Sequence, residues 1–599
     1  MATINLTDFL RIPFDFLIVG GGTAGLVLAA RLSEEPSVLV GVIEAGSLRL
    51  GDPKVDLPTG PGQMLGDSEY DWNFRSVPQH GTNDKVYHIP RGKMLGGSSG
   101  INFMSYNRPS AEDIDDWANK LDLKGWTWSE LLPYFKRNET LELPQPSSRS
   151  PIALEAHGQS GPIHTSIGPW EAPIEESLLA AFDEASGLQR PNEVYSGAHL
   201  GFYRSLFTLD RTSKPVRSYA ANGYLTPIKG RANLKVLENA QVCRVLLSDA
   251  LDRAPVAEGV ELYHHGARHS VLTKKEVILS AGAIQSPQLL ELSGIGDPRI
   301  LQAAGIACKV ANADVGSNLQ EHTMSAEHRS LYTKHGSGAL SGSVGLMGFT
   351  PYSLLSTEAR RDATTARILE PLRVRREPSQ QNVAFQSKQQ EAIAARMRHP
   401  RSADVQFIGT PAYFNAAAGW ENCSKIMSGP PDGHNACYSI VVSNMYPLSR
   451  GSVHVRTASP LDAPAIDPGF LSHPVDIDVL AAGIVFADRV FQCAQVRNHV
   501  RRRVSPPPGL NLLNVDEVRG FVRNHIVPYH HALGTCAMGQ VVDERLRVKG
   551  VRRLRVVDAS VMPMQVSAAI MATVYAIAEK ASDLIKEEYR FGGQLRAHI

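Results

Sequence analysis

The sequence contains few cysteines, and none of them forms the close pairs that metal and redox sites use. The chain of 599 residues has six, namely Cys243, Cys308, Cys423, Cys437, Cys493 and Cys536. Zinc sites and dense disulfide frameworks need more closely spaced thiols. We therefore expect no metal site and free thiols, with a disulfide between Cys423 and Cys437 as the alternative if the protein is secreted.

Long apolar runs and an export signal are also missing. The longest apolar stretch, residues 16–30, is shorter than the roughly 18 residues that a membrane helix needs, and it is interrupted by adjacent glycines. Asp8, Arg11 and Asp15 interrupt the first residues, so no continuous apolar segment of a signal peptide is visible. These absences predict a cytoplasmic protein that does not bind a membrane.

An excess of charge of one sign is lacking as well. The 61 basic residues are balanced by 60 acidic residues, which gives a net charge of +1. Without a net field, the chain is not expected to attract nucleic acid or anionic lipid. The composition is 43% hydrophobic and 20% charged, as in ordinary globular proteins, and the length predicts two large domains or a two-lobed enzyme. The expected partner is a small-molecule substrate, and the oligomeric state stays open.

What is present begins with the pattern of a dinucleotide-binding βαβ unit. A strand (FDFLIV), a glycine turn, a helix (LVLAARL) and a second strand (VLVGVIE) follow one another between residues 14 and 44. In the turn, Gly20 permits the tight bend, Gly22 lets a pyrophosphate approach the backbone, and Gly25 lets the helix pack on the strand. At the end of the second strand, the Glu44 carboxylate can accept both hydroxyls of an adenosine ribose. The pattern favours FAD or NAD over NADP and leaves open which of the two is bound.

Further motifs follow in a fixed order. Residues 92–102 (GKMLGGSSGIN) form a second glycine-serine loop, and residues 282–296 follow the strand EVILSA. Residues 314–322 (DVGSNLQEH) and 447–451 (PLSRG) lie between them and the C-terminal motifs. Those motifs are residues 531–539 (HALGTCAMG) and 554–563 (LRVVDASVMP). A single glycine loop is weak evidence for any one kind of protein, but the whole set of motifs in this order is specific.

With these motifs the chain resembles the glucose–methanol–choline (GMC) oxidoreductase family, nearly from end to end. The resemblance implies an α/β protein (α+β overall), with a Rossmann-type FAD-binding domain and a substrate domain built on an antiparallel sheet flanked by helices. Residues 10–325 would be mainly the discontinuous FAD-binding domain, and residues 326–445 the variable part of the substrate domain. Residues 446–590 would complete the substrate domain and return to the FAD domain with the catalytic histidine.

The resemblance also implies cofactor contacts, position by position. The pyrophosphate would lie at the glycine turn, the ribose at Glu44, residues 102–105 by the isoalloxazine, and Val242 by the adenine. For Trp72, a purely structural role is an equal alternative. The expected FAD contacts are Gly20, Gly22, Thr23, Ala24, Gly25, Glu44, Ala45, Trp72, Leu95, Gly97, Ser99, Asn102, Phe103, Met104, Ser105, Val242, Asp558, Ala559, Ala569 and Met571.

The mode of flavin attachment follows from one position of the second loop. Some members of the family attach the flavin covalently through a histidine just before the asparagine of this loop. Ile101 occupies that place and cannot form such a bond. We therefore expect FAD to be bound noncovalently.

His531 aligns with the catalytic base of the family. An imidazole suits this task because its ordinary pKa lies near neutrality. The resemblance implies that His531 removes the hydroxyl proton of an alcohol while the hydride passes to flavin N5. His530 is a second catalytic candidate. In an extended segment its side chain would point away from the side that His531 faces, which favours a structural role for it.

Two positions depart from the family pattern. Ala532 replaces the usual proline after the catalytic histidine, which changes backbone stiffness rather than chemistry. Ala569 stands where most relatives carry a histidine or asparagine that hydrogen-bonds the substrate oxygen. A methyl group cannot do so. Either a group from the variable middle segment replaces it, or the reaction is not ordinary alcohol oxidation.

Three functions therefore stay open. The leading hypothesis is an FAD-dependent alcohol oxidase or dehydrogenase that acts on a small aromatic or polyketide-like hydroxyl compound. The second is a redox-neutral lyase or cyclase in which FAD is structural, and the third is a flavin-binding protein without catalysis.

The sequence pattern predicts further secondary structure outside the motifs. Residues 361–378 and 388–400 are expected to form exposed helices whose charges face solvent. Helices are also expected near residues 477–492 and 572–588. Residues 501–508 (RRRVSPPP) are expected to be a surface connection, because consecutive prolines cannot continue a helix or a central strand.

Overall fold

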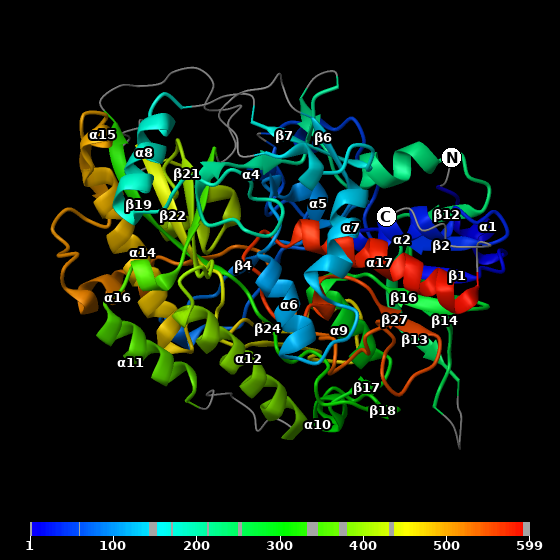
Figure 1. Ribbon diagram of the computed structural model, residues 1–599. Helices are drawn as coiled ribbons and strands as arrows, with labels where there is room; N and C mark the ends of the chain where they lie inside the picture. Colours follow the sequence, from blue (N-terminus) through cyan, green and yellow to red (C-terminus); the bar gives the residue numbers. More distant parts are fainter. Residues whose placement is uncertain are drawn as a thin grey trace.

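A computed structural model describes residues 3–58, 60–142, 152–168, 172–212, 215–248, 254–331, 345–370, 380–429 and 437–590. Two large sheets lie in the two halves of the molecule, with helices around each (Figure 1). The mixed α/β architecture with a second, antiparallel sheet confirms the predicted fold class.

A five-stranded parallel sheet forms one half of the molecule. Its strands pair in the order β12-β2-β1-β16-β27. They are β12 (Leu234–Leu237), β2 (Val40–Ile43), β1 (Phe16–Val19), β16 (Glu276–Leu279) and β27 (Leu554–Val556). Apart from the half-buried Lys235 of β12, these strands are buried without alternation, as is usual for strands covered on both faces. Strand β2 lies on one side of β1 and β16 on the other, so the order of the strands reverses at β1. The carboxyl end of β1 is therefore a topological switch point, where ligands bind in such folds.

Helices complete this half of the molecule. Helix α2 (Thr23–Leu32) begins at the glycine turn after β1, and α17 (Met571–Tyr589) packs against α2 and α7 (Trp128–Asn138). On α7, Thr127 and Glu130 form a capping box that fixes its first turn. Helix α17 confirms the C-terminal helix expected at residues 572–588, with bounds one residue wider at each end. A three-stranded antiparallel sheet lies beside α9 (Gly282–Leu292) and consists of β13 (Gln241–Leu247), β14 (Ala257–His264) and β15 (Ala267–Leu272).

The other half is built on a seven-stranded antiparallel sheet. Six strands pair in the order β25-β19-β22-β21-β20-β8, and β26 pairs with β19. They are β25 (Val500–Ser505), β19 (Thr323–Leu331), β22 (Cys437–Asn444), β21 (Val405–Thr410), β20 (Leu346–Thr350), β8 (Gly201–Arg204) and β26 (Val527–Pro528). Helix α14 (Pro474–Gln492) packs on β19 and β22, and it contacts α8 (Glu175–Ser186) and α16 (Val515–Asn524). The helix expected near residues 477–492 is therefore confirmed as α14.

The remaining elements are short. The strands are β3 (Phe74–Arg75), β4 (His88–Ile89), β5 (Ser105–Tyr106), β6 (Glu139–Glu142), β7 (Ile163–Ile167), β9 (Leu206–Phe207), β10 (Leu209–Asp210), β11 (Val216–Arg217), β17 (Ile295–Gly296), β18 (Val310–Ala311), β23 (Ser452–His454) and β24 (Ala465–Asp467). The α-helices are α1 (Leu6–Leu10), α3 (Pro53–Asp56), α4 (Pro61–Met64), α5 (Ser98–Ile101), α6 (Ala111–Asn119), α10 (Pro298–Ala303), α13 (Ala416–Gly419) and α15 (Ala494–Arg497).

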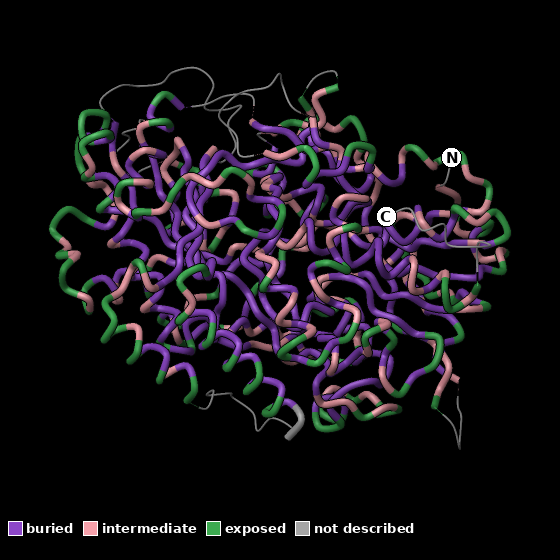
Figure 2. The backbone as a smooth tube through the Cα atoms, viewed as in Figure 1, coloured by how far each residue is buried: buried purple, intermediate pink, exposed green. Residues whose placement is uncertain are grey.

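The two halves share one hydrophobic core. A single cluster of buried apolar side chains includes Val42 of the parallel sheet and Val442 of the antiparallel sheet. Figure 2 shows buried backbone running through both halves without an exposed layer between them. Among the described residues, the helices are too short or too polar to cross a membrane.

Helix α12 (Gln380–Arg398) corrects one sequence expectation. Helix α11 (Glu358–Ile368) is largely exposed, as expected, and residues 371–379 lie outside the described part of the chain. In α12, however, Gln389 is fully buried and its Nε2 donates to the carbonyl of Pro563 at 2.6 Å. Arg396 is buried too and binds Asp116 at 2.8 Å. A charged helix can be buried where every polar group meets a partner, and these partners come from distant parts of the chain.

The expectation for residues 501–508 is also wrong in part. Residues up to Ser505 belong to β25, which pairs with β19 at the edge of the antiparallel sheet. The strand ends directly before the three prolines. Arginine side chains suit a solvent-exposed edge, and proline ends the ladder because it has no N–H to donate.

Candidate active site

A cavity of about 310 Å³ lies between the two sheets. At one end it reaches the carboxyl ends of β1 and β2, where Val19 and Ile43 line it. At the other end it reaches the antiparallel sheet, where Met324, Ile408 and Val441 line it. The cavity therefore joins the switch point of the parallel sheet to the face of the second sheet.

The glycine turn after β1 forms one wall of the cavity. Gly20 has φ +97°, a conformation that side chains disfavour. A Cβ on Gly25 would lie 1.9 Å from the carbonyl oxygen of Gly20, so only glycine lets α2 pack this closely on the strand. No side chain caps the N-terminus of α2, and its first residues face the cavity. Uncapped N–H groups at a helix N-terminus attract an anion such as a pyrophosphate.

The second glycine loop lies directly against the first. A Cβ on Gly97 would stand 2.8 Å from the Cα of Gly22, so the two backbones touch. Ser99 holds this loop, because its hydroxyl donates to the carbonyl of Gly96 at 2.6 Å. The two loops form a slot of main-chain groups that added side chains would fill.

Glu44 stands at the end of β2 with its carboxylate held by the backbone. Its Oε2 accepts from the N–H of Gly21 and its Oε1 from the N–H of Gly46, both at 2.8 Å. Burial raises the pKa of Glu44 to about 7. Each carboxylate oxygen has a further lone pair, so Glu44 can also accept from a ligand hydroxyl.

Most of the residues expected to contact FAD line the cavity. Gly25 and Leu95 do not. Gly25 lies behind the turn, and the Leu95 side chain supports the turn from beneath Gly21. The expected residues that line the cavity are Gly20, Gly22, Thr23, Ala24, Glu44, Ala45, Trp72, Gly97, Ser99, Asn102, Phe103, Met104, Ser105, Val242, Asp558, Ala559, Ala569 and Met571.

Asp558 lines the cavity, but its carboxylate is already engaged within the protein. Its Oδ2 accepts from the N–H of Gly282 and from the hydroxyl of Ser286, at 2.9 and 2.6 Å. Its Oδ1 accepts from the N–H and the hydroxyl of Ser560. Asp558 thus joins the end of β27 to the start of α9, and a ligand would meet this region mainly through backbone.

Asn102 is fixed in a similar way. Its Oδ1 accepts from the N–H of Met104 at 3.0 Å and from Arg217 at 2.8 Å, and its Nδ2 points to the sulfur of Met571. Met104 has φ +61°, so the chain turns sharply here. The segment therefore presents a rigid edge to the cavity.

His531 lines the cavity where the two halves meet. Its Nδ1 lies 2.9 Å from Nδ1 of His322, and its backbone N–H donates to Oε1 of Glu321 at 2.5 Å. Burial lowers the pKa of His531 well below its usual value, and the neighbouring His322 adds to the effect. A neutral imidazole is able to accept a proton.

Tyr529 packs on the ring of His531. The ring centroids are 4.0 Å apart with a tilt of 27°. Tyr529 lines the cavity, and its hydroxyl has no hydrogen-bond partner among the described residues. Burial raises the pKa of Tyr529, so the hydroxyl stays protonated and can donate. The sequence analysis expected any replacement for the group missing at Ala569 to come from the variable middle segment, residues 326–445, and Tyr529 lies outside that segment, so this donor was missed.

His530 does not have the extended backbone that the sequence argument assumed. Its φ is +67°, and its side chain reaches the thiol of Cys423, with Nε2 3.6 Å from Sγ. Arg91 donates to its carbonyl oxygen at 2.9 Å, and burial lowers the pKa of His530 to about 3. The residue still borders the cavity, and Cys423 is a buried free thiol.

The far end of the cavity is apolar. Phe414 and Ile426 face it from segments that no motif marked, and Ile408 and Val441 face it from the sheet. Thr410 adds a hydroxyl at the end of β21. Arg91 also borders the cavity, and the sequence analysis did not predict it as a site residue. The short apolar runs in β21 and β22 are also found in ordinary buried strands, so no sequence pattern marked this wall.

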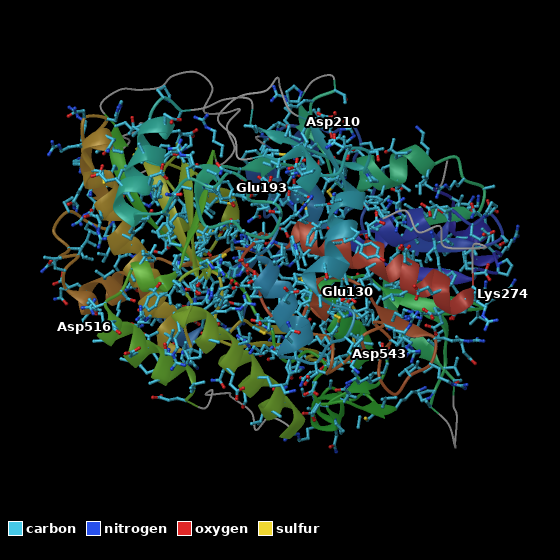
Figure 3. The ribbon with its side chains drawn as sticks, viewed as in Figure 1. Glu130, Glu193, Asp210, Lys274, Asp516 and Asp543 are labelled. Atoms are coloured by element: carbon cyan, nitrogen blue, oxygen red, sulfur yellow. The ribbon has the colours of Figure 1, made fainter. Side chains whose placement is uncertain are left out.

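One group of possible metal ligands lies elsewhere in the described chain. Ligand atoms of Glu142, His164 and Asp210 lie within 4.8 Å of one another, and none of the three residues lines the cavity. Figure 3 places Asp210 near the upper edge of the molecule. The N–H of Arg211 donates to Glu142 at 2.7 Å and that of Thr212 to Asp210 at 2.9 Å. These hydrogen bonds engage one oxygen of each carboxylate within the protein.

Comparisons with known proteins agree with the geometry. Two family models described as GMC oxidoreductase match residues 14–324 and 447–578. A protein named Dehydrogenase mpl7 from Monascus purpureus is 75% identical, with the whole of both chains covered. An FAD-dependent oxidoreductase from Chaetomium thermophilum is 27% identical, with a TM-score of 0.86 over 97% of this chain and 100% of that one. A fungal aryl-alcohol oxidase is 26% identical, with a TM-score of 0.80 over 97% and 100%.

Proposed function

Because the chain belongs to the GMC oxidoreductase family of FAD-dependent enzymes, we propose that it oxidises the hydroxyl group of a small, uncharged aromatic or polyketide-like molecule. The observation that carries the proposal is the buried imidazole of His531 in a cavity with two unlike ends. One end is made of glycine backbone and the other of apolar side chains.

The backbone end fits FAD. The backbone of Gly22 leaves no room for a side chain at Gly97, and the uncapped start of α2 offers N–H groups to a pyrophosphate. Glu44 would accept from the ribose hydroxyls, and Val242 borders the same end. Ile101 has no nucleophilic atom, which supports noncovalent binding. Bound FAD supplies the two-electron acceptor for the hydride of the alcohol carbon.

His531 takes the proton in this proposal. The O–H bond of the substrate breaks, and its proton moves to Nε2 of His531. The C–H bond breaks as well, its electron pair leaves with the hydride, and the alcohol becomes a carbonyl compound. The burial that lowers the pKa of His531 keeps the imidazole neutral and ready to accept at neutral pH.

Tyr529 would orient the substrate oxygen. Tyr529 borders the cavity with its ring packed on His531, and Ala569 leaves the usual position of the second hydrogen-bonding group without a polar atom. A neutral donor and a neutral acceptor next to each other suit an alcohol, which can accept one hydrogen bond and donate another. His530 is assigned a positioning role, because its ring is held by Cys423.

The apolar end supports the substrate class. Phe103, Phe414 and Ile426 offer flat and branched surfaces to a ring, and aromatic substrates gain from such contacts. Arg91 is the cationic side chain that borders the cavity, and it lies beside Glu321 at 3.7 Å and donates to His530. An uncharged ring bearing a hydroxyl group fits this wall better than a sugar with many hydroxyls.

Anaerobic mixing of the FAD-loaded protein with benzyl alcohol and larger uncharged aromatic alcohols tests the proposal. We expect the visible absorption of the flavin to bleach, with the aldehyde or ketone formed in equal amount. Product without bleaching would instead support the redox-neutral lyase or cyclase, which the methyl group of Ala569 makes the second candidate. Neither bleaching nor product with any alcohol would reject both.

A further inference from the structure

We propose that His322 is a positioning residue that holds the proton of His531 on Nδ1 and thereby leaves Nε2 free to act as the base. The inference rests on the proposed function of His531. It adds a residue that lies outside the expected site, and it specifies which nitrogen of His531 reacts.

The argument starts at the far side of the His322 ring. His322 is fully buried, and its Nε2 lies 3.0 Å from the carbonyl oxygen of Met445. A carbonyl oxygen can only accept, so Nε2 of His322 must carry a hydrogen. A neutral imidazole has one N–H, and burial lowers the pKa of His322 to about 4. Its Nδ1 therefore has a lone pair and no hydrogen.

This lone pair decides the tautomer of His531. Nδ1 of His322 and Nδ1 of His531 are 2.9 Å apart, and the two rings stand nearly perpendicular, at 78°. Because the His322 nitrogen can only accept, Nδ1 of His531 must donate. His531 is then protonated on Nδ1, and its Nε2 carries the lone pair.

The reactive nitrogen is the one left without a protein partner. Nε2 of His531 has no hydrogen bond to the described residues, and the side chain borders the cavity. The backbone fixes the ring from the other side, since the N–H of His531 donates to Glu321 and its carbonyl oxygen accepts from Gln565 at 2.9 Å. One lone pair therefore points to the place where a substrate hydroxyl can bind.

The surroundings keep this arrangement neutral before the reaction. The titratable groups around His531 are His322, His530, Tyr529, Glu321 and Arg91. Burial lowers the pKa of all three histidines and raises that of Tyr529. When His531 takes a proton on Nε2, its Nδ1–H still points to the lone pair of His322, which stabilises the cation. Without that acceptor, the buried Nδ1–H would have no partner, and the other tautomer would place a hydrogen on Nε2.

Two polar substitutions separate the two bonds of His322. An asparagine oxygen occupies nearly the place of Nδ1, so His322→Asn keeps the acceptor for His531. A glutamine amide reaches nearly the place of Nε2, so His322→Gln keeps the donor to Met445 and lacks the acceptor. Both variants are polar and similar in size, and His322→Leu removes both bonds.

The experiment uses ¹⁵N-histidine-labelled holoenzyme, with His531→Gln to assign the His531 signals. We expect His531 in the wild type and in His322→Asn to show a protonated Nδ1 and a bare Nε2. In His322→Gln and His322→Leu the two nitrogens should exchange these roles or become mixed. A protonated Nε2 in the wild type, or unchanged signals in both His322→Gln and His322→Leu, would overturn the inference.

Anaerobic flavin reduction by benzyl alcohol gives the second readout. We expect about a 100-fold slower reduction in His322→Gln with little change in KM, recovery in His322→Asn, and an altered pH profile. Equal rates in the Asn and Gln variants would contradict a role through the acceptor nitrogen. Failure of the proposed function looks different, because then the wild type itself is not bleached while the nitrogen signals still follow the substitutions.

Discussion

The two ends of the cavity are built from different parts of the chain. At the parallel sheet, the wall is mostly main chain, and Gly20 and Gly97 are there because a side chain would not fit. At the antiparallel sheet, the wall consists of side chains such as Ile408, Phe414 and Val441. A backbone wall demands glycine at fixed places and is visible in a sequence. A wall of apolar side chains uses the same residue types as any hydrophobic core, so it cannot be recognised in a sequence.

The largest effect should come from breaking the backbone end. In Gly25→Ala, the new Cβ would lie 1.9 Å from the carbonyl oxygen of Gly20, so α2 must move away from β1. We expect purified protein without flavin absorption, and a loss of about 1–3 kcal/mol or more of stability from overpacking. Absorption spectra and thermal unfolding measure both effects. Gly520 also lies in a helix but has open space around it, so Gly520→Ala should retain flavin.

The next largest effect should come from the imidazole between the two ends. His531→Asn removes the base and leaves the glycine slot intact, so FAD should stay bound. Anaerobic flavin reduction should slow by about 10²–10⁴-fold, the usual contribution of a general base. The control is His265→Asn, since His265 is exposed in a turn with φ +46°, where asparagine is well tolerated. Reduction at the wild-type rate in His531→Asn would remove this residue from the mechanism.

A smaller effect is expected at the side-chain end. Tyr529→Phe keeps the ring against His531 and removes the hydroxyl. If that hydroxyl donates to the substrate oxygen, flavin reduction should slow by about tenfold, as expected for one neutral hydrogen bond. Stopped-flow absorption checks this, with Tyr263→Phe on β14 as a matched control. A rate equal to the wild type would leave the gap beside Ala569 without a replacement.

The smallest effect concerns pH at the backbone end. Burial raises the pKa of Glu44 from 4.5 to about 7. A protonated carboxyl accepts less well from ribose hydroxyls, so FAD affinity should fall as the pH drops below about 7, by at most about tenfold per pH unit. In Glu44→Gln this dependence should be absent, and a titration of apoprotein with FAD across this range measures it. If FAD affinity changes with pH in Glu44→Gln as it does in the wild type, the pH dependence comes from another group.

The same carboxyl predicts the opposite trend for the apoprotein. A carboxyl whose folded pKa is raised contributes stability that is present below its unfolded pKa and is lost as the pH rises through the folded pKa. For Glu44 this window runs from 4.5 to about 7. Apoprotein unfolding should therefore occur at lower temperature as the pH rises through this window, and less so in Glu44→Gln.

Much of the fold was predictable because it depends on local rules. The βαβ unit, the C-terminal helix and α14 follow from apolar spacing and glycine, and all three lie where they were expected. Helix α12 was misjudged because its buried Gln389 and Arg396 are polar. Their partners are Pro563 and Asp116, which are far away in the sequence and become neighbours only in the folded chain.

The candidate site divides in the same way. Position 531 was predictable from its motif, and residue 322 also stands in a motif, but nothing in the motif indicates that the two rings meet. His530 was misjudged because its backbone turns through φ +67° instead of staying extended. The hydroxyl of Tyr529 becomes significant only because its ring lies on that of His531 and no described residue binds its hydroxyl.

By itself, the sequence determined the glycine turn, the acid at the end of β2, the order of the motifs and the position of the candidate base. These features follow from steric and chemical demands that act over a few residues. Only the tertiary structure decided which nitrogen of His531 meets His322, which groups border the cavity, and which polar residues are buried. Each of these depends on contacts between segments hundreds of residues apart, and their distances are set by packing rather than by local sequence.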